Sequence, residues 1–195
     1  LDKAREEIGL SAYAGDLAGI SVDLAWISEV PDEESLALLI QANASQIGLK
    51  VNVLKMPWSS YVEQVTSLDT TPNAGVCFMS PDYDEVGSLL YQRYNSETAG
   101  TWQQIEWLQD PSIDAQISES LTTMDEAARF AIYADLQKEA MDMVYGISVA
   151  EQYQKYAYYD YIKWPADENI KAGKPVSTML GYNFVLRTFE VGEPQ

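Results

Sequence analysis

The sequence of 195 residues contains no histidine and a single cysteine, Cys77. Without histidine the chain cannot form a serine–histidine or cysteine–histidine nucleophile, and it lacks the usual nitrogen ligands of zinc. One cysteine also excludes a disulfide within the chain. Because Cys77 lies in an apolar run, we expect it to be a small buried hydrophobic residue. We therefore expect neither a metal site nor a cofactor.

Basic residues are scarce as well. Twelve lysines and arginines face thirty acidic residues, which gives a net charge of −18 at pH 7. This negative field repels nucleic-acid phosphates and anionic lipid headgroups, so we expect no nucleic-acid partner. No run approaches the roughly 20 apolar residues of a membrane span, and we expect no direct membrane insertion of this chain. The chain begins at Leu1 without a methionine, which indicates a fragment or a processed product.

The composition is otherwise that of a globular protein, with 47% hydrophobic and 22% charged residues. A chain of this length can bury roughly 70% of its unfolded surface, so it can form a core without disulfides. The amino-terminal part has the pattern of a strand, a helix and a second strand over residues 20–26, 31–47 and 49–55. Such a unit normally pairs its strands in parallel. The predicted fold class is therefore α/β.

More elements follow along the chain. The polar, turn-rich residues 92–104 predict an exposed loop. The alternating residues 182–191 predict a final strand. The remaining predictions are helices over residues 2–9 and 58–68 and after residues 110 and 125, a buried strand over 74–79, and a helical turn at 89–90.

An acidic loop after the predicted buried strand is the first candidate for chemistry. Asp82 and Asp84 begin a calcium-loop pattern, but Val86 and Arg93 stand where further ligands belong, which excludes an EF-hand type site. Asp84 and Glu85 are expected simply to lead the helix that follows. Asp82 differs because it follows the carboxyl end of a strand, where open α/β sheets place their ligands.

Aromatic residues are the second candidate. Trp58, Trp102, Trp107 and the thirteen tyrosines could line a cleft for peptides or sugars, since aromatic faces stack well and tyrosine keeps a polar tip. The alternative is that most of them are ordinary core and surface residues. The chain has no glycine-rich phosphate loop of either common type.

Several short motifs, taken in chain order, resemble the family 5 extracytoplasmic solute-binding proteins, which are the dipeptide- and oligopeptide-binding components of ABC importers. The resemblance covers residues 2 to about 190. The motifs are Asp2-Lys3-Ala4-Arg5 before a glycine, Leu39–Asn43 continuing through Gln46–Val51, Pro57-Trp58 with Tyr61, Pro81-Asp82-Tyr83, and Asp114–Ser120 followed by Asp125–Arg129 and Tyr133.

The resemblance implies that residues 1–195 are the carboxy-terminal lobe of a two-lobed protein that closes around its ligand by a hinge motion. The fold would be a periplasmic-binding-protein-like α/β lobe with a mixed, mostly parallel sheet flanked by helices. The amino-terminal lobe and its membrane-anchoring segment would be missing from this chain, and strand 182–191 would belong to or pair with that lobe. The protein would be periplasmic or extracellular and would work with ABC permease subunits.

The resemblance also implies that the chain is not an enzyme and captures a small peptide or similar solute. In peptide-binding members the aspartate of the corner motif binds the α-amino group of the ligand, a role that falls to Asp82 here. Trp58, Phe78, Met79 and Tyr83 would line the cleft. An oligosaccharide-binding member stays an alternative, because Phe78 and Met79 stand where peptide binders usually have Gly-Trp.

Two classes outside transport also stay open. A carboxylate-dependent hydrolase needs a second acid about 5 to 10 Å from Asp82. A pure interaction module would present a flat apolar patch instead of a pocket near Asp82.

Overall fold

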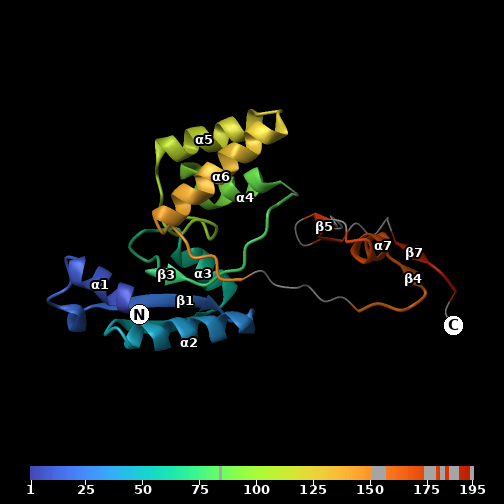
Figure 1. The fold of residues 1–195 in the computed structure, drawn as a ribbon. Coiled ribbons are helices and arrows are strands. Elements are labelled where there is room, and N and C mark those ends of the chain that lie inside the picture. The colour runs from blue at the N-terminus through green and yellow to red at the C-terminus, as the bar shows by residue number, and fades with distance from the viewer. Residues whose placement is uncertain (84, 151–156, 174–178, 181–182, 185–188, 194–195) are drawn as a thin grey trace. The chain divides into compact units, whose positions relative to one another are not determined.

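The computed structural model describes residues 1–83, 85–150, 157–173, 179–180, 183–184 and 189–193 (Figure 1). The chain divides into two units. The first comprises Leu1–Met79 and Gln92–Asp114, and the second comprises Ser80–Tyr91 and Ala115–Gln195.

A three-stranded parallel sheet organises the first unit. Strand β1 (Ser21–Ile27) lies between β2 (Lys50–Met56) and β3 (Ala74–Gly75). Its register with β2 is continuous over seven residue pairs. Helix α2 (Pro31–Ser45) connects β1 to β2 and contacts both strands. Figure 1 shows it running beside β1. The predicted strand–helix–strand unit is confirmed, and with it the α/β fold class.

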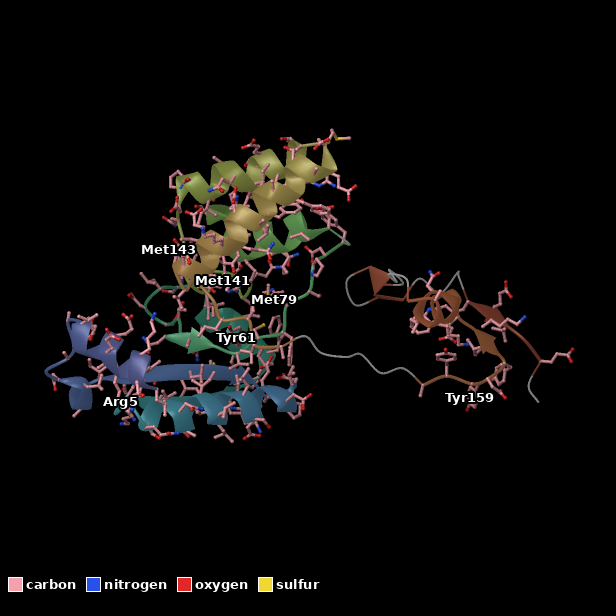
Figure 2. All side chains as sticks on the ribbon, in the orientation of Figure 1. Arg5, Tyr61, Met79, Met141, Met143 and Tyr159 are labelled. Atoms are coloured by element: carbon pink, nitrogen blue, oxygen red, sulfur yellow. The ribbon has the colours of Figure 1, made fainter. Side chains whose placement is uncertain are left out.

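The ends of α2 follow from local chemistry. Pro31 occupies the first turn, where its missing N–H costs nothing, and three acidic residues follow it near the positive end of the helix dipole. After the helix, Gly48 adopts φ +84°, a conformation that only glycine reaches without strain. Arg5 of α1 (Asp2–Leu10) donates a hydrogen bond to the Gln46 carbonyl at 3.2 Å, which ties α1 to this end of α2 (Figure 2).

The two faces of the sheet are buried against different helices, because successive strand residues point to opposite faces. Helix α2 packs on one face, and the segment that begins with α3 (Trp58–Gln64) packs on the other. The first cluster contains Leu24, Trp26, Ala37, Ala44, Val51 and Val76, and the second contains Ala25, Ile27, Met56, Tyr61 and Val65.

The second unit is built on helices. Helices α5 (Pro111–Thr122) and α6 (Glu126–Asp142) are joined by a hydrogen bond from Gln116 to Glu139 at 3.1 Å. Asp125 caps α6 by accepting the Ala128 N–H at 2.8 Å, which confirms the predicted start of this helix. The buried residues of this group include Leu90, Ile117, Ser120, Tyr133, Leu136 and Ala140.

The carboxy-terminal residues form short antiparallel pairs. Strand β4 (Ile162–Lys163) pairs with β7 (Glu190–Val191), and β5 (Met179–Leu180) pairs with β6 (Asn183–Phe184). Helix α7 (Pro165–Lys171) lies between β4 and β5 in the chain. The single strand predicted over 182–191 is replaced by two short ones, 183–184 and 190–191, which pair with different partners. Residue 189 is not in a strand, and residues 182 and 185–188 lie outside the described residues. The pairing of this segment with another lobe stays a prediction.

The strand predicted over 74–79 is wrong in its length. Only Ala74 and Gly75 pair with β1, followed by one more hydrogen bond from the Val76 N–H to the Ala25 carbonyl at 2.9 Å. The apolar run reflects burial, since Val76 is in the core, and burial does not require the chain to continue as a strand.

The exposed loop predicted over 92–104 is also wrong. Helix α4 (Val86–Tyr94) includes its first residues, and Gln92, Asn95 and Gln104 are buried. Gln104 donates to the Asn95 carbonyl at 2.7 Å, and Arg93 donates to the Gln103 carbonyl at 2.5 Å. Buried polar side chains are stable when they are hydrogen-bonded in this way, so polarity alone did not mean exposure.

Within the described ranges, no helix combines the length and the apolar character that crossing a membrane requires.

Candidate functional site

Three of the predicted site residues lie in the first unit, in segments that follow the carboxyl ends of its strands. All three strands run in the same direction, so the segments that follow them leave from one edge. Trp58 comes two residues after β2, and Phe78 and Met79 follow β3 by three and four residues. Figure 2 labels Met79 on the chain beyond β3. Phe78 and Met79 are half-buried.

Trp58 presents an aromatic surface that its neighbours hold in place. Its side chain is 38% exposed. Its ring lies edge-on to Trp102 with 5.1 Å between centroids and stacks on Tyr61 at 6.2 Å. An ordered and partly exposed indole can stack on a sugar ring or an aromatic side chain. The prediction that Trp58 is available for ligand contact fits this geometry.

Glu29, in the turn after β1, fixes the start of the helix that carries Trp58. Both carboxylate oxygens accept the Trp58 N–H, each at 3.1 Å, and Ser28 donates to one of them at 2.8 Å. The hydrogen bond from the Trp58 main chain lowers the pKa of Glu29. Sequence reasoning missed Glu29, because a contact across 29 residues leaves no local pattern.

Glu33 is the most buried acid at this edge, with 1% of its surface exposed. Its Oε2 accepts the N–H of Ile27, the last residue of β1, at 2.8 Å. The main chain of Ile27 and that of Phe78 both favour the charged form of the carboxyl, but burial outweighs them. Burial raises the pKa of Glu33. Burial, with Glu33 nearby, also raises the pKa of the Cys77 thiol to about 12, which keeps that thiol protonated. The side chain of Cys77 is half-buried, whereas the sequence predicted a buried one.

A partly buried ion pair lies in the same unit. Arg93 bonds to Glu106, and burial of Glu106 raises the pKa of its carboxyl despite the guanidinium. The sequence did not predict this pair, because its two residues stand near the ends of a segment that we expected to be an exposed loop.

Asp82 and Tyr83 belong to the second unit. The Asp82 side chain is exposed, and its main-chain N–H donates to the Ser88 hydroxyl at 3.1 Å. Tyr83 is 50% exposed. Asp84 lies outside the described residues. The predicted site residues are thus divided between the units, and a site that joins Trp58, Phe78 and Met79 to Asp82 and Tyr83 stays a prediction.

Glu85 does more than lead the next helix. Its carboxylate accepts a hydrogen bond from Tyr133 and lies 3.5 Å from the Arg129 Nε. From the sequence we expected Glu85 only to lead the helix that follows, because its two partners lie more than 40 residues away in the chain.

Comparison with known proteins identifies solved structures that share this fold. No protein-family profile matches the sequence, and no curated protein is significantly similar to it. Solved structures do match. The oligopeptide-binding protein AppA from Bacillus subtilis, in complex with a nonapeptide, is 17% identical with a TM-score of 0.60, over 74% of this chain and 30% of AppA.

Two further structures match to a similar extent. The murein tripeptide-binding protein MppA from Escherichia coli is 17% identical with a TM-score of 0.63, over 74% of this chain and 27% of MppA. The binding protein AgaA from A. tumefaciens R10, in complex with agropinic acid, is 20% identical with a TM-score of 0.63, over 74% of this chain and 28% of AgaA.

The chain therefore spans less than a third of the length of each of these proteins. At these identities the match establishes the fold. The prediction of a periplasmic-binding-protein-like α/β lobe is confirmed, and the resemblance drawn from the sequence motifs agrees with the solved structures that share this fold.

Proposed function

We propose that the chain is one lobe of the substrate-binding component of an ABC importer and captures a small peptide or similar solute. The observation that carries this proposal is the fold shared over about three quarters of the chain with peptide-binding and solute-binding proteins. The motifs that resemble family 5 solute-binding proteins support it independently, since they come from the sequence alone.

Asp82 is the residue that we propose for the α-amino group of the ligand. Its carboxylate is exposed, and its main chain is held through Ser88. A carboxylate and an ammonium form a charge-assisted hydrogen bond, which is stronger than one between neutral groups. The net charge of −18 would also attract a cationic group during encounter. Trp58, Phe78, Met79 and Tyr83 would contact the remainder of the ligand.

The partners and location belong to the same proposal. The second lobe would complete the cleft, and the ABC permease subunits would receive the ligand. We propose a periplasmic or extracellular location with attachment to a membrane through a segment outside this chain. These points rest on the resemblance and on the fold.

The proposal assigns binding without catalysis. The proteins that share the fold are binding proteins. In addition, the carboxylate of Glu85, three residues from Asp82, is bound by Tyr133 and Arg129, which removes it as the free second acid of a hydrolase.

The experiment is a thermal-shift panel on the complete protein, with di- to pentapeptides against cello- and xylo-oligosaccharides. A ligand at 100 times its dissociation constant stabilises a protein by about 2.7 kcal/mol, which raises Tm by a few degrees. We expect a peptide to give this shift and Asp82→Asn to abolish it. Asp135→Asn is the matched control, because Asp135 is an exposed aspartate of α6 in the same unit.

The other outcomes separate the alternatives. A peptide shift that survives Asp82→Asn would keep the function and reject Asp82 as the amine contact. No shift with any compound would reject the proposed ligand classes.

The second candidate is an oligosaccharide ligand, and the exposed ring of Trp58 favours it. A sugar shift that is unaffected by Asp82→Asn and lost in Trp58→Ala would establish it, because stacking on an indole contributes to sugar binding without a charged partner.

A further inference from the structure

The segment that contains Asp82 is fastened to helix α6. Tyr133 of α6 is only 2% exposed, and its hydroxyl donates to Glu85 Oε1. Arg129, one turn earlier in the same helix, places its Nε 3.5 Å from that oxygen. We call Glu85, Arg129 and Tyr133 the corner clamp. All three belong to the second unit, together with Asp82.

A series of hydrogen bonds links the main chain of Glu85 to that of Asp82. The Glu85 N–H donates to the Tyr83 carbonyl at 2.7 Å, and the Ser88 N–H donates to the Glu85 carbonyl at 3.1 Å. The buried Ser88 hydroxyl then accepts the Asp82 N–H at 3.1 Å. A shift of Glu85 therefore moves or breaks the bonds that orient Asp82 and Tyr83.

Gly87 lets the first turn of α4 approach the clamp. A Cβ atom at this position would lie 2.8 Å from the Tyr133 hydroxyl and 3.0 Å from Leu121 Cδ2. The first distance is shorter than real Cβ contacts and the second is tighter than most, so a larger residue would have to displace the Tyr133 hydroxyl. The close approach brings the Tyr133 hydroxyl to the acid that directly precedes α4.

The two α6 side chains are themselves fixed. Arg129 donates to the Thr123 carbonyl at 3.0 Å, in the connection between α5 and α6. Burial and the hydrogen bond to Glu85 raise the pKa of Tyr133, so its hydroxyl keeps the proton that it donates. The arrangement pairs a permanent cation and a permanent donor with one carboxylate.

We propose that Arg129 and Tyr133 are positioning residues for ligand binding. They hold Glu85, and through it they keep the main chain at Asp82 and Tyr83 in the orientation that presents the Asp82 carboxylate to the amino group of the ligand. Ordering this loop in advance removes a cost that binding would otherwise bear. The step from the clamp to the ligand rests on the proposed function of Asp82; the clamp itself does not.

The first experiment follows amide hydrogen exchange in the ligand-free, full-length protein. Tyr133→Phe removes one hydroxyl and keeps the buried ring. We expect the amides of Asp82, Glu85 and Ser88 to exchange about tenfold faster or more, which is the lower end of the effect of losing one hydrogen bond to a charged group. The amide of Leu136, deeper in α6, should not change.

Tyr158→Phe is the matched control for this variant. Tyr158 also donates its hydroxyl to a carboxylate, that of Asp167, in the same unit. It should leave the exchange of the three corner amides unchanged. Unchanged exchange of those amides in Tyr133→Phe would overturn the inference, whatever the ligand is.

The second experiment compares trialanine with N-acetyl-trialanine, which lacks the free amino group. We expect Tyr133→Phe to weaken trialanine about fivefold and to leave the acetylated peptide unaffected. An equal loss for both peptides would overturn the positioning role, because a general loss of structure does not discriminate between them.

Two further variants complete the test. Arg129→Lys keeps the charge and should retain most of the discrimination between the peptides, whereas Arg129→Met should reduce it about as much as Tyr133→Phe. The double variant Arg129→Met/Tyr133→Phe should lose no more discrimination between the peptides than the more impaired of the two single variants, since both residues act through Glu85. Additive losses would overturn the shared route.

The two experiments also distinguish the inference from the proposed function. If the parent protein binds neither peptide, the proposed function fails, and the claim about the ligand fails with it. The exchange experiment still decides whether the clamp holds the corner.

Discussion

The buried side chain of Glu33 has one stabilising contact and one destabilising effect on the fold. Its Oε2 accepts the N–H of Ile27 and so completes the hydrogen bonding at the end of β1. The main chain of Phe78 also favours the charged form, but burial of the carboxyl outweighs both hydrogen bonds and raises its pKa. An ionised carboxylate in such a place destabilises the fold, whereas a protonated one is tolerated.

We therefore predict a pH dependence that Glu33→Gln removes. The pKa of Glu33 is higher in the folded than in the unfolded chain, so between the two values the folded chain binds the extra proton. The free energy of unfolding of the parent should fall relative to the variant as the pH rises above about 4.5, the usual range for glutamate. Urea unfolding from pH 4 to pH 8 measures this difference.

Glu34→Gln is the control for that comparison, since Glu34 is the exposed neighbour in the same helical turn. It should follow the parent at every pH. A parent that gains stability over Glu33→Gln with rising pH would show that the carboxylate is stabilised by its surroundings and not penalised by burial.

At the scale of elements, the contact between β3 and α3 depends on one missing side chain. A Cβ atom on Gly75 would lie 2.6 Å from the Tyr61 hydroxyl and 3.0 Å from Ile105 Cδ1. Tyr61 is 1% exposed and has little room to move. The glycine therefore lets α3 pack closely against the edge strand, which in turn sets where the chain towards Phe78 and Met79 begins.

Gly75→Ala should accordingly destabilise the fold by about 1–3 kcal/mol, the usual cost of overpacking a core. Chemical unfolding monitored by tryptophan fluorescence provides the measurement. Gly9→Ala is the matched control, because nothing lies within 4 Å of the added methyl and the residue is in a helix. That control should be neutral or stabilising by up to about 1 kcal/mol. Equal effects of the two substitutions would contradict the packing argument.

At the scale of the whole molecule, net charge is the dominant property. Thirty acids and twelve bases leave −18 charges on 195 residues. Ion pairs among the described residues include Arg5–Asp2, Arg93–Glu106 and Arg129–Glu85, so several of the few basic residues already have an acidic partner. The remaining acids repel one another, and this repulsion opposes the compact state.

Salt should therefore stabilise the protein. Raising NaCl from 20 to 300 mM shortens the Debye length to well below 10 Å, and we expect Tm to rise by about 2–4 °C. Differential scanning calorimetry measures the shift, and KCl at equal concentration should reproduce it if screening is the cause. A Tm that is constant or falls with salt would mean that attractive pairs outweigh the repulsion.

Local sequence determined the framework of this protein. Alternation over β1, the acidic first turn and apolar spacing of α2, and Gly48 after it predicted the strand–helix–strand unit, because period and capping act over a few residues. The capped start of α6 was predictable for the same reason. The order of the short motifs predicted the binding-protein fold.

Tertiary structure decided what depends on distant partners. Within residues 92–104, Gln92, Asn95 and Gln104 are buried. Arg93 and Gln104 donate hydrogen bonds inside the unit, which polarity alone cannot reveal. Glu33 becomes a buried acid only where β1 ends beside α2, and Glu85 becomes part of a clamp only where α6 passes it. Hydrogen bonds and burial between residues that are far apart in the chain leave no periodic trace in the sequence, whereas secondary structure does.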